Sequence, residues 1–235
     1  NFKAQNREEI KTLSSLVDEI EKQSNIQLDE LKTELKTIRL NSDDFSAIVN
    51  DVLQSVVSVG TNTGLGSGAV IDDRGFIVTN FHVVSGASII RVLAYDNRIY
   101  DAPLIGYDST ADVAVLKVNA QLKSLQFGDS DKVQIGERVI ALGNPAGLSF
   151  TVTEGIISAI HRKGPNNLNI YLQTDVSINP GNSGGPLVDI NSKIIGINNF
   201  KISGFESLGF AIESNTVKEV SGNIINQYLQ QSAQQ

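Results

Sequence analysis

Two patterns of apolar residues divide the chain, and the first occupies residues 1 to about 40. This stretch contains no glycine or proline and is rich in charged residues. Its apolar residues recur at intervals of three and four, in two blocks: Ile10, Leu13, Val17 and Ile20, then Leu28, Leu31, Leu35 and Ile38. Such spacing predicts a helix with a narrow apolar seam. We therefore assign residues 1–42 to an N-terminal helical segment.

The two blocks of this segment are out of register by four residues. Continuing the first block would place Ser24 and Gln27 in the seam. The offset indicates either a stutter in a coiled coil or a helix break near Ser24 and Asn25. Two interpretations stay open: an intermolecular coiled coil that oligomerises the protein, or a helix or helical hairpin packed on its own chain.

The second pattern begins at Val56 and is typical of β-strands. Short apolar runs alternate with turn signals such as Asp72-Asp-Arg-Gly75, which predicts a hairpin. Strands are expected at 56–59, 68–71, 76–79, 89–93, 112–118, 138–142, 150–153, 155–160, 168–172, 185–188, 193–197 and 208–212. Many short strands favour barrels or a sandwich. A short helix is expected to precede them, ending near Leu53.

The C-terminal part returns to helical spacing. Val217, Val220, Ile224 and Tyr228 recur at helical intervals, with Ser214 or Asn215 placed to cap the helix. We therefore predict one domain over residues 43–229 and a polar tail at 230–235.

Composition narrows the functional classes. The net charge is −7, which argues against nucleic acid or an anionic membrane as the main partner. The chain has no cysteine and two histidines, so thiolate chemistry is excluded and a histidine-rich metal site is not expected. No run of 18 apolar residues occurs. The chain begins at Asn1 rather than methionine, which leaves room for an upstream signal or membrane anchor.

The stretch from Gln173 to Leu187 has the features of a nucleophile loop. Glycines on both sides of Ser183 permit a sharp turn and a close approach to substrate, and prolines stiffen the flanks. The successive N–H groups of Gly181, Asn182 and Ser183 can converge on one point, as an oxyanion requires. A bare glycine-serine cluster is usually only a turn, so the interpretation needs partner residues.

A serine nucleophile needs a histidine base and a carboxylate that holds the histidine in one tautomer. His82 directly follows a predicted strand, whereas His161 lies in a charged turn. Asp112 opens an apolar strand, where an acid either caps a turn or is buried with a partner. Taken alone, His82 also fits a core histidine and Asp112 a capping residue. The order His82, Asp112, Ser183, divided between two β-rich halves, favours a catalytic triad in a cleft between them.

The region from Phe45 to Val220 resembles the protease domain of the HtrA (Deg) family of chymotrypsin-fold serine endopeptidases. The motifs that carry the resemblance include Val78-Thr-Asn-Phe-His-Val-Val84, Ala111-Asp-Val-Ala-Val-Leu116, Thr151-Val-Thr-Glu-Gly-Ile-Ile-Ser158 and Asn179-Pro-Gly-Asn-Ser-Gly-Gly-Pro-Leu187. The resemblance implies a mostly β fold of two six-stranded antiparallel barrels. It also implies His82 as general base, Asp112 as its orienting carboxylate, Ser183 as nucleophile, and Gly181 and Ser183 N–H groups as oxyanion donors. After Ile212 we expect a helix and a glutamine-rich tail rather than the PDZ domain of many family members.

The resemblance also implies where the primary specificity pocket lies. Its floor is expected at Ser177, six residues before the nucleophile, with walls from Ile178 and from the segment Ile197, Asn198, Asn199 and Phe200. Because an aspartate at the floor is what favours Lys or Arg, Ser177 predicts cleavage after aliphatic residues instead.

The predicted function is therefore hydrolysis of unfolded or exposed polypeptides by a serine endopeptidase. We expect no cofactor and no metal, a homo-oligomer built on the trimer interface of HtrA protease domains or on the N-terminal segment, and an extracytoplasmic location. The alternative is a chaperone-like peptide-binding assembly whose protease site is mostly latent.

Overall fold

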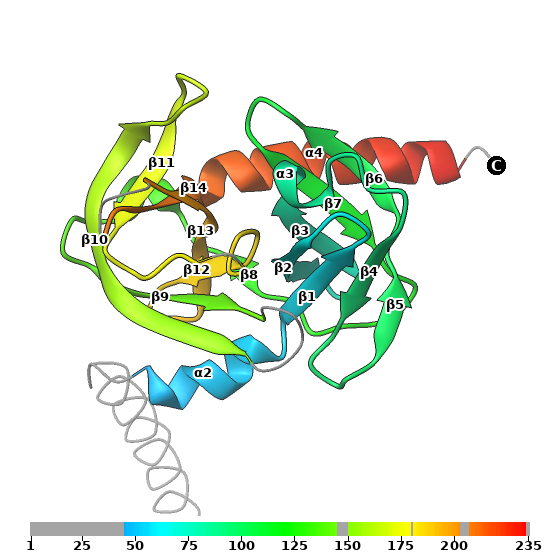
Figure 1. The fold of residues 1–235 in the computed structure, drawn as a ribbon, viewed down its shortest axis with the longest axis horizontal. Coiled ribbons are helices and arrows are strands. Elements are labelled where there is room, and N and C mark those ends of the chain that lie inside the picture. Colours follow the sequence, from blue (N-terminus) through cyan, green and yellow to red (C-terminus); the bar gives the residue numbers. More distant parts are fainter. Residues whose placement is uncertain (1–44, 145–149, 180, 203–206, 234–235) are drawn as a thin grey trace, which may run out of the picture. The chain divides into compact units, whose positions relative to one another are not determined.

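A computed structural model describes residues 45–144, 150–179, 181–202 and 207–233 (Figure 1). The N-terminal helical segment, residues 1–42, lies outside the described residues, and so do Pro180 and the end of the polar tail. A short helix, α2 (Ser46–Leu53), precedes the first strand as predicted. Its N-cap, Phe45, makes no side-chain capping hydrogen bond, while the expected capping cluster at 41–44 lies outside the described residues.

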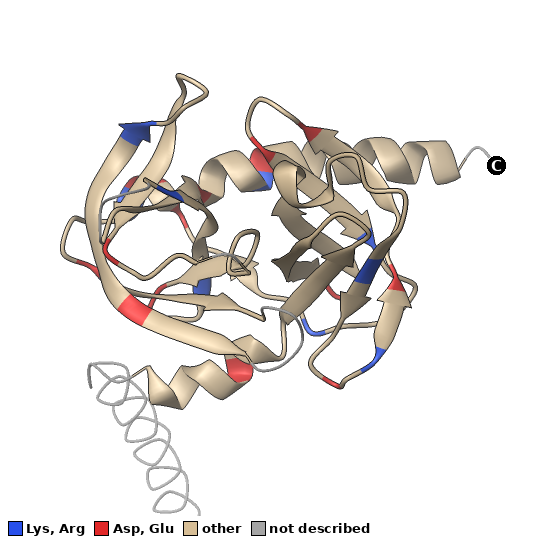
Figure 2. Ribbon diagram, in the orientation of Figure 1, with Lys and Arg blue, Asp and Glu red and all other residues tan. Residues whose placement is uncertain are grey.

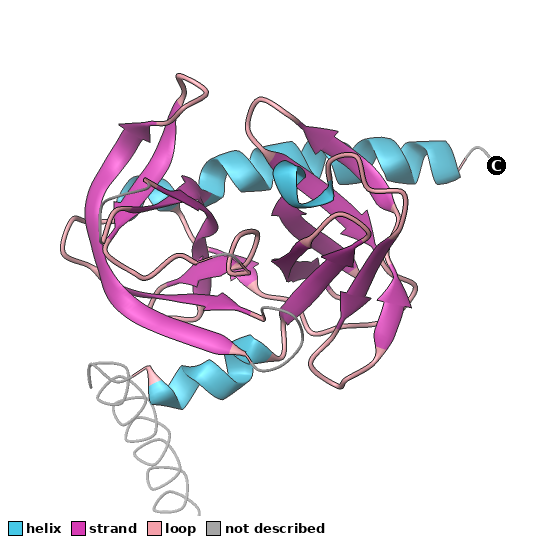
Figure 3. Ribbon diagram, in the orientation of Figure 1, coloured by secondary structure: helices cyan, strands magenta, loops and turns pink. Residues whose placement is uncertain are grey.

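The first half of the domain is one curled antiparallel sheet (Figure 3). Its elements are β1 (Val56–Thr61), β2 (Leu65–Asp72), β3 (Phe76–Asn80), the short helix α3 (Phe81–Val84), β4 (Ile90–Leu93), β5 (Ile99–Asp101), β6 (Leu104–Asp108) and β7 (Val113–Lys117). The strand order is β5-β4-β1-β2-β3-β7-β6. The predicted hairpin is confirmed: β2 pairs with β3, and Gly75 takes a φ of +88° in the turn between them.

The second half is a closed barrel. Its elements are β8 (Gln126–Phe127), the 3₁₀ turn η1 (Ser130–Lys132), β9 (Arg138–Gly143), β10 (Thr151–Lys163), β11 (Asn169–Thr174), β12 (Pro186–Val188), β13 (Lys193–Lys201) and β14 (Gly209–Glu213). The order β12-β9-β10-β11-β14-β13 closes because β13 also pairs with β12, which makes a barrel of six strands. The strands expected at 150–153 and 155–160 are one strand, β10.

The expectation of two closed six-stranded barrels is met in only one half. In the first sheet β5 and β6 stand at opposite ends and do not pair with each other among the described residues. The C-terminal helix α4 (Ser214–Ser232) instead packs against β6 and β7, where the side chain of Ile224 lies over Gly106. A helix that covers an edge strand prevents that edge from pairing with another chain, as closure of the sheet into a barrel would.

The two halves share a core. One cluster of buried side chains joins Val56 and Val78 of the first sheet to Ile140 and Ile212 of the second. Helix α4 extends to Ser232, beyond the predicted end at Tyr228, and runs from the barrel to the first sheet (Figure 1). None of the helices in the described ranges is long and apolar enough to cross a membrane. Acidic and basic residues are interspersed over both halves (Figure 2).

Candidate active site

His82 and Asp112 lie together at one end of the first sheet. His82 belongs to α3, which directly follows β3, and Asp112 directly precedes β7, the neighbour of β3. The Nδ1 atom of His82 lies 2.6 Å from Oδ2 of Asp112, and the backbone N–H of His82 donates to Oδ1 at 2.8 Å. The carboxylate therefore holds both the ring and the backbone of the histidine.

The backbone of Asp112 is fixed in an uncommon conformation. Its φ is +57°, a region in which side chains other than glycine are rare. Its carbonyl oxygen accepts hydrogen bonds from the Phe81 N–H at 3.2 Å and from the Asn80 side-chain amide at 3.2 Å. These contacts offset the strain and aim the carboxylate at His82. A histidine that carries its proton on Nδ1 would donate to this carboxylate and leave Nε2 unprotonated, which is the arrangement that a general base requires.

A third group contacts the carboxylate from the opposite half of the domain. The side-chain amide of Asn199, on β13, donates to Oδ2 of Asp112 at 2.7 Å. Asn199 is almost fully buried, with 6% of its surface exposed. Sequence reasoning had assigned it to the specificity pocket. The contact joins residues 87 positions apart, so no local sequence pattern could have revealed it.

Ser183 reaches the site on a loop that β2 holds in place. The Ser67 N–H donates to the Ser183 carbonyl at 2.9 Å, and the Ser67 hydroxyl donates to the Gly181 carbonyl at 2.5 Å. Gly184 has a φ of +85°, and a Cβ there would lie 2.2 Å from the Ser67 carbonyl oxygen. Only glycine fits at that position, which explains part of the motif around the serine.

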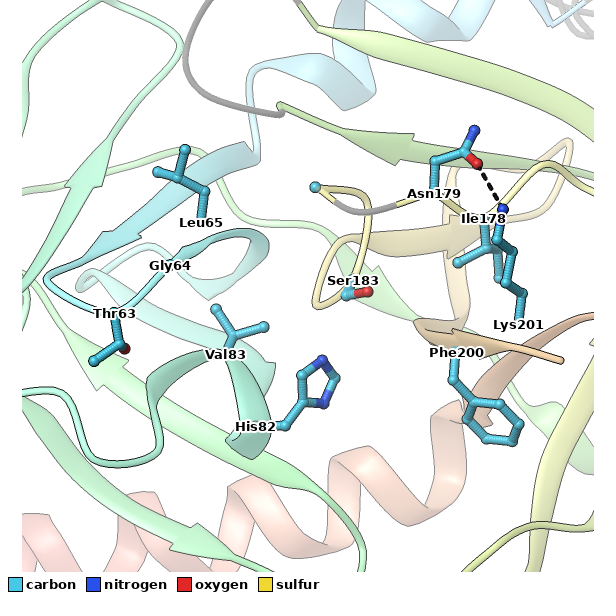
Figure 4. Close-up of a pocket in the computed structure, with 11 residues that line it drawn as sticks. Thr63, Gly64, Leu65, His82, Val83, Ile178, Asn179, Ser183, Phe200 and Lys201 are labelled. Carbon is cyan, nitrogen blue, oxygen red and sulfur yellow. Dashed lines mark hydrogen bonds between the residues drawn. The ribbon is translucent and has the colours of Figure 1, made fainter. Parts of the chain in front are cut away.

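The hydroxyl of Ser183 donates to the carbonyl of Asn199 at 3.0 Å. No hydrogen bond joins Ser183 to His82 among the described residues, although both side chains line one cavity, His82 from the first half and Ser183 from the second (Figure 4). A rotation about the Ser183 Cα–Cβ bond is the motion that would redirect the hydroxyl. Catalytic hydrogen bonds are often absent or long before substrate binds.

Two of the three expected oxyanion donors are free within the described part of the chain. The N–H groups of Gly181 and Ser183 have no acceptor there, and Gly181 takes a φ of +106°. The N–H of Asn182 donates instead to the Asn179 carbonyl at 2.9 Å, and Asn182 is buried. Unpaired backbone N–H groups beside a nucleophile are the kind of donor that an oxyanion hole requires.

The cavity has a volume of about 430 Å³ and lies between the two halves. The first half contributes Thr63, Gly64, Leu65, His82 and Val83, and the second Ile178, Asn179, Gly181, Ser183, Phe200 and Lys201 (Figure 4). The lining includes no carboxylate. No group of three or more His, Cys, Asp or Glu that could hold a metal occurs in the described ranges.

Of the six residues expected to form the specificity pocket, the structure places Ile178 and Phe200 in the cavity lining. Ser177 is exposed, and its carbonyl accepts a hydrogen bond from Thr153 at 3.2 Å. Ile197 is buried in the shared core, and the amide of buried Asn198 donates to the Pro186 carbonyl at 3.1 Å. The sequence analysis did not include Lys201, which lines the cavity next to Phe200; a bulge in β13 between Asn198 and Phe200 shifts which residues of this strand face the cavity.

Comparison with known proteins places this site in a family context. Residues 66–197 match the family model described as a trypsin-like peptidase domain. The periplasmic serine endoprotease DegP of Escherichia coli K12 is 43% identical over 169 residues, which are 68% of this chain and 36% of that protein. The serine protease Do-like HtrA of Bacillus subtilis is 44% identical over 185 residues, which are 72% of this chain and 41% of that protein. This chain therefore spans less than half the length of these relatives.

Two solved structures are similar in fold as well as in sequence. The HtrA-type protease AlgW with a tripeptide superposes with a TM-score of 0.73 and 38% identity, covering 78% of this chain and 64% of that one. The serine endoprotease from Yersinia pestis gives a TM-score of 0.71 and 39% identity, with 78% and 67% covered.

Proposed function

Because this chain belongs to the HtrA/DegP family of trypsin-like serine proteases, we propose that it is a serine endopeptidase that cleaves unfolded or exposed polypeptides. The observation that carries the proposal is the 2.6 Å contact that Asp112 makes with His82, which lines the same cavity as Ser183. An ordinary surface histidine with a hydrogen-bonded carboxylate would require neither the strained backbone of Asp112 nor the second contact that Asn199 makes with that carboxylate.

The proposed reaction proceeds through an acyl-enzyme. The Ser183 Oγ attacks the carbonyl carbon of the scissile bond while Nε2 of His82 takes its proton. The N–H groups of Gly181 and Ser183 stabilise the negative charge on the former carbonyl oxygen. The imidazolium then gives its proton to the leaving amine, and the C–N bond breaks to leave an ester on Ser183. A water molecule, deprotonated by His82, hydrolyses that ester and restores the serine.

Asp112 acts through His82 rather than on substrate. Its carboxylate keeps the proton on Nδ1, which leaves Nε2 in the accepting state, and it stabilises the imidazolium that forms in each step. The hydrogen bond from Asn199 holds Oδ2 in place. Asn199 therefore serves as a positioning residue for the carboxylate.

The side chain before the scissile bond is proposed to be aliphatic. Ile178 and Phe200 supply apolar surface to the cavity, and no carboxylate lines it to pair with Lys or Arg. The ammonium of Lys201, also in the lining, would further disfavour a basic side chain. Cleavage sites in casein, mapped by mass spectrometry, should follow Val, Ala, Ile or Leu; cleavage mainly after Lys or Arg would contradict this assignment.

The decisive experiment is labelling with a fluorophosphonate probe together with casein digestion. The wild-type chain should be labelled on Ser183 and should cleave casein, whereas Ser183→Ala should do neither. Ser85→Ala, at an exposed serine outside the cavity, is the matched control and should behave as wild type. Casein cleavage by Ser183→Ala at the wild-type rate would overturn the proposal.

The alternative function is a chaperone-like peptide-binding assembly with a mostly latent site. The hydrogen bond from Ser183 to the Asn199 carbonyl favours it, because that bond holds the hydroxyl away from His82. Peptide binding by the wild-type chain without any labelling of Ser183 would support this alternative.

The remaining proposals concern the division of the chain into segments, its location and its assembly. Residues 1–42 are proposed as an oligomerising helical segment, residues 43–229 as the protease domain, and 230–235 as a polar tail. The DegP relatives are named periplasmic endoproteases, which supports an extracytoplasmic location for this protein. An upstream membrane anchor and a trimeric or larger homo-oligomer remain part of the proposal.

A further inference from the structure

Strand β13 offers a free edge that begins beside the nucleophile. Up to Ile197 this strand pairs with β12 on one side and β14 on the other. From Asn199 to Lys201 it pairs only with β14 within the described residues. The Asn199 carbonyl lies on the free edge, because it accepts the Ser183 hydroxyl at 3.0 Å. An extended peptide can add to such an edge as an antiparallel strand.

Lys201 lies two residues beyond Asn199 on this edge and lines the cavity. Its ammonium donates to the Asn179 side-chain oxygen at 3.1 Å, the contact drawn as a dashed line in Figure 4. That partner is neutral, and no ion pair to Lys201 occurs within the described ranges. An ammonium has three donors, so two remain for another acceptor.

The charge of Lys201 contrasts with that of the chain as a whole. The net charge is −7, yet the cavity lining contains no Asp or Glu, and its only other ionisable side chain is His82. Distant acidic residues are screened over a Debye length of about 8 to 10 Å. Asp112 does not line the cavity but contacts His82, so Lys201 is the one permanently charged side chain among the described residues that line it.

The register of the free edge indicates which substrate residue lies opposite Lys201. The residue before the scissile bond must place its carbonyl carbon at Ser183, which puts that residue opposite Asn199. In an antiparallel pair the second substrate residue before the scissile bond then lies opposite Phe200, and the third substrate residue before that bond lies opposite Lys201. Directly opposed side chains share one face with Cβ atoms about 5 Å apart.

We propose that Lys201 selects substrates with an acidic side chain at the third residue before the scissile bond. The inference rests on the proposed endopeptidase function, and it adds a charged subsite to the aliphatic one at Ile178 and Phe200. Opposite charges on directly opposed strand positions favour pairing enough to give about a two- to fivefold preference. The preference should weaken as the salt concentration rises.

The test uses the full chain and two peptides that differ only by Glu or Gln at the third position before an aliphatic cleavage site. We expect kcat/KM to be about two- to fivefold higher for the Glu peptide. The ratio should fall to about one in Lys201→Gln and invert in Lys201→Glu. Lys193→Gln is the matched control, since Lys193 lies on the same strand but outside the cavity, and its ratio should match wild type.

The outcomes separate this inference from the proposed function. Absence of any Ser183-dependent cleavage would overturn the protease assignment alone. The charge preference can still be measured without turnover, as the binding of the same two peptides to Ser183→Ala by fluorescence anisotropy. The role of Lys201 would be overturned by equal kcat/KM values for the Glu and Gln peptides or by a Glu-to-Gln ratio that Lys201→Gln leaves unchanged. A preference for an acidic residue at another substrate position would also overturn it.

Discussion

At the scale of single residues, the site depends on how Asp112 is held. Its carboxylate contacts the ring and backbone of His82 and the amide of Asn199, all at 2.6 to 2.8 Å. Its side chain is only 20% exposed, so these partners replace most of its water. The proposed chemistry therefore requires that the side chain of Asp112 is negatively charged and accepts hydrogen bonds.

Asp112→Asn should lower kcat by about 10⁴-fold, because an amide stabilises the wrong tautomer of His82 while keeping the shape of the side chain. The measurement is steady-state cleavage of an aliphatic-site peptide. Asp101→Asn, at an exposed carboxylate on β5, is the control and should retain wild-type kcat. A loss below tenfold for Asp112→Asn would show that His82 is oriented without the carboxylate.

At the scale of elements, the hairpin of β10 and β11 reaches from the barrel to the segment before Asp112. The amide of Asn166 donates to the Thr110 carbonyl at 2.8 Å and to the Tyr171 hydroxyl at 2.9 Å. Burial raises the pKa of Tyr171, the negative charge of Asp112 raises it further, and the hydrogen bond from Asn166 acts in the opposite direction. The hairpin therefore places a buried phenol within the electrostatic influence of the Asp112 carboxylate.

This raised pKa predicts a loss of stability at alkaline pH. A tyrosine whose folded-state pKa lies above its unfolded value of 10.0 contributes stability that is fully present below that pH. The contribution is lost as the pH rises through the higher folded-state pKa. The urea midpoint should therefore fall less in Tyr171→Phe than in wild type between about pH 9 and pH 11.

The control for this measurement is Tyr107→Phe, since Tyr107 is 54% exposed and should leave the alkaline loss as in wild type. An identical fall in Tyr171→Phe and wild type would mean that other groups control alkaline unfolding.

Helix α4 provides a second test at this scale, through its contact with β6. A Cβ added to Gly106 would lie 2.6 Å from Cγ2 of Ile224, so Gly106→Ala should destabilise the domain by about 1–3 kcal/mol. Gly222→Ala, on the same helix with no atom within 4 Å of its added Cβ, should instead stabilise by up to about 1 kcal/mol. Urea unfolding measures both.

The double variant Gly106→Ala/Ile224→Ala checks the mechanism. If the clash is the cause, the cost of Gly106→Ala should shrink when Ile224 is already shortened. Simple additivity of the two costs would place the effect elsewhere.

At the scale of the whole molecule, the first sheet and the barrel form one folding unit. Residues from both halves pack in one buried cluster, which begins at Phe45 and includes Val217 of α4. The triad candidates are divided in the same way, with His82 and Asp112 on the first sheet and Ser183 on the barrel. The shared core is therefore what keeps the cavity assembled.

Deleting residues 1–42 should leave this core intact, because the cluster starts at Phe45. If those residues form an intermolecular bundle, the deletion should lower the molecular mass in solution without changing the Tm by more than a few degrees. Light scattering and thermal unfolding of the full and shortened chains measure both quantities. An unchanged mass would place the oligomer contacts in the protease domain or show that the segment packs within its own chain.

The sequence by itself determined the local features of this protein. Alternating apolar residues predicted most strands, the turn at Gly75 predicted the first hairpin, and the glycines around Ser183 predicted a sharp loop, since each follows from short-range backbone preferences. Contacts between distant segments were decided only by the tertiary structure. The hydrogen bond from Asn199 to Asp112 and the packing of α4 on β6 join residues remote in sequence, and the bulge before Lys201 arises where β13 pairs with β14. Their partners are set by how the sheets pack, and no periodicity along the chain encodes that packing.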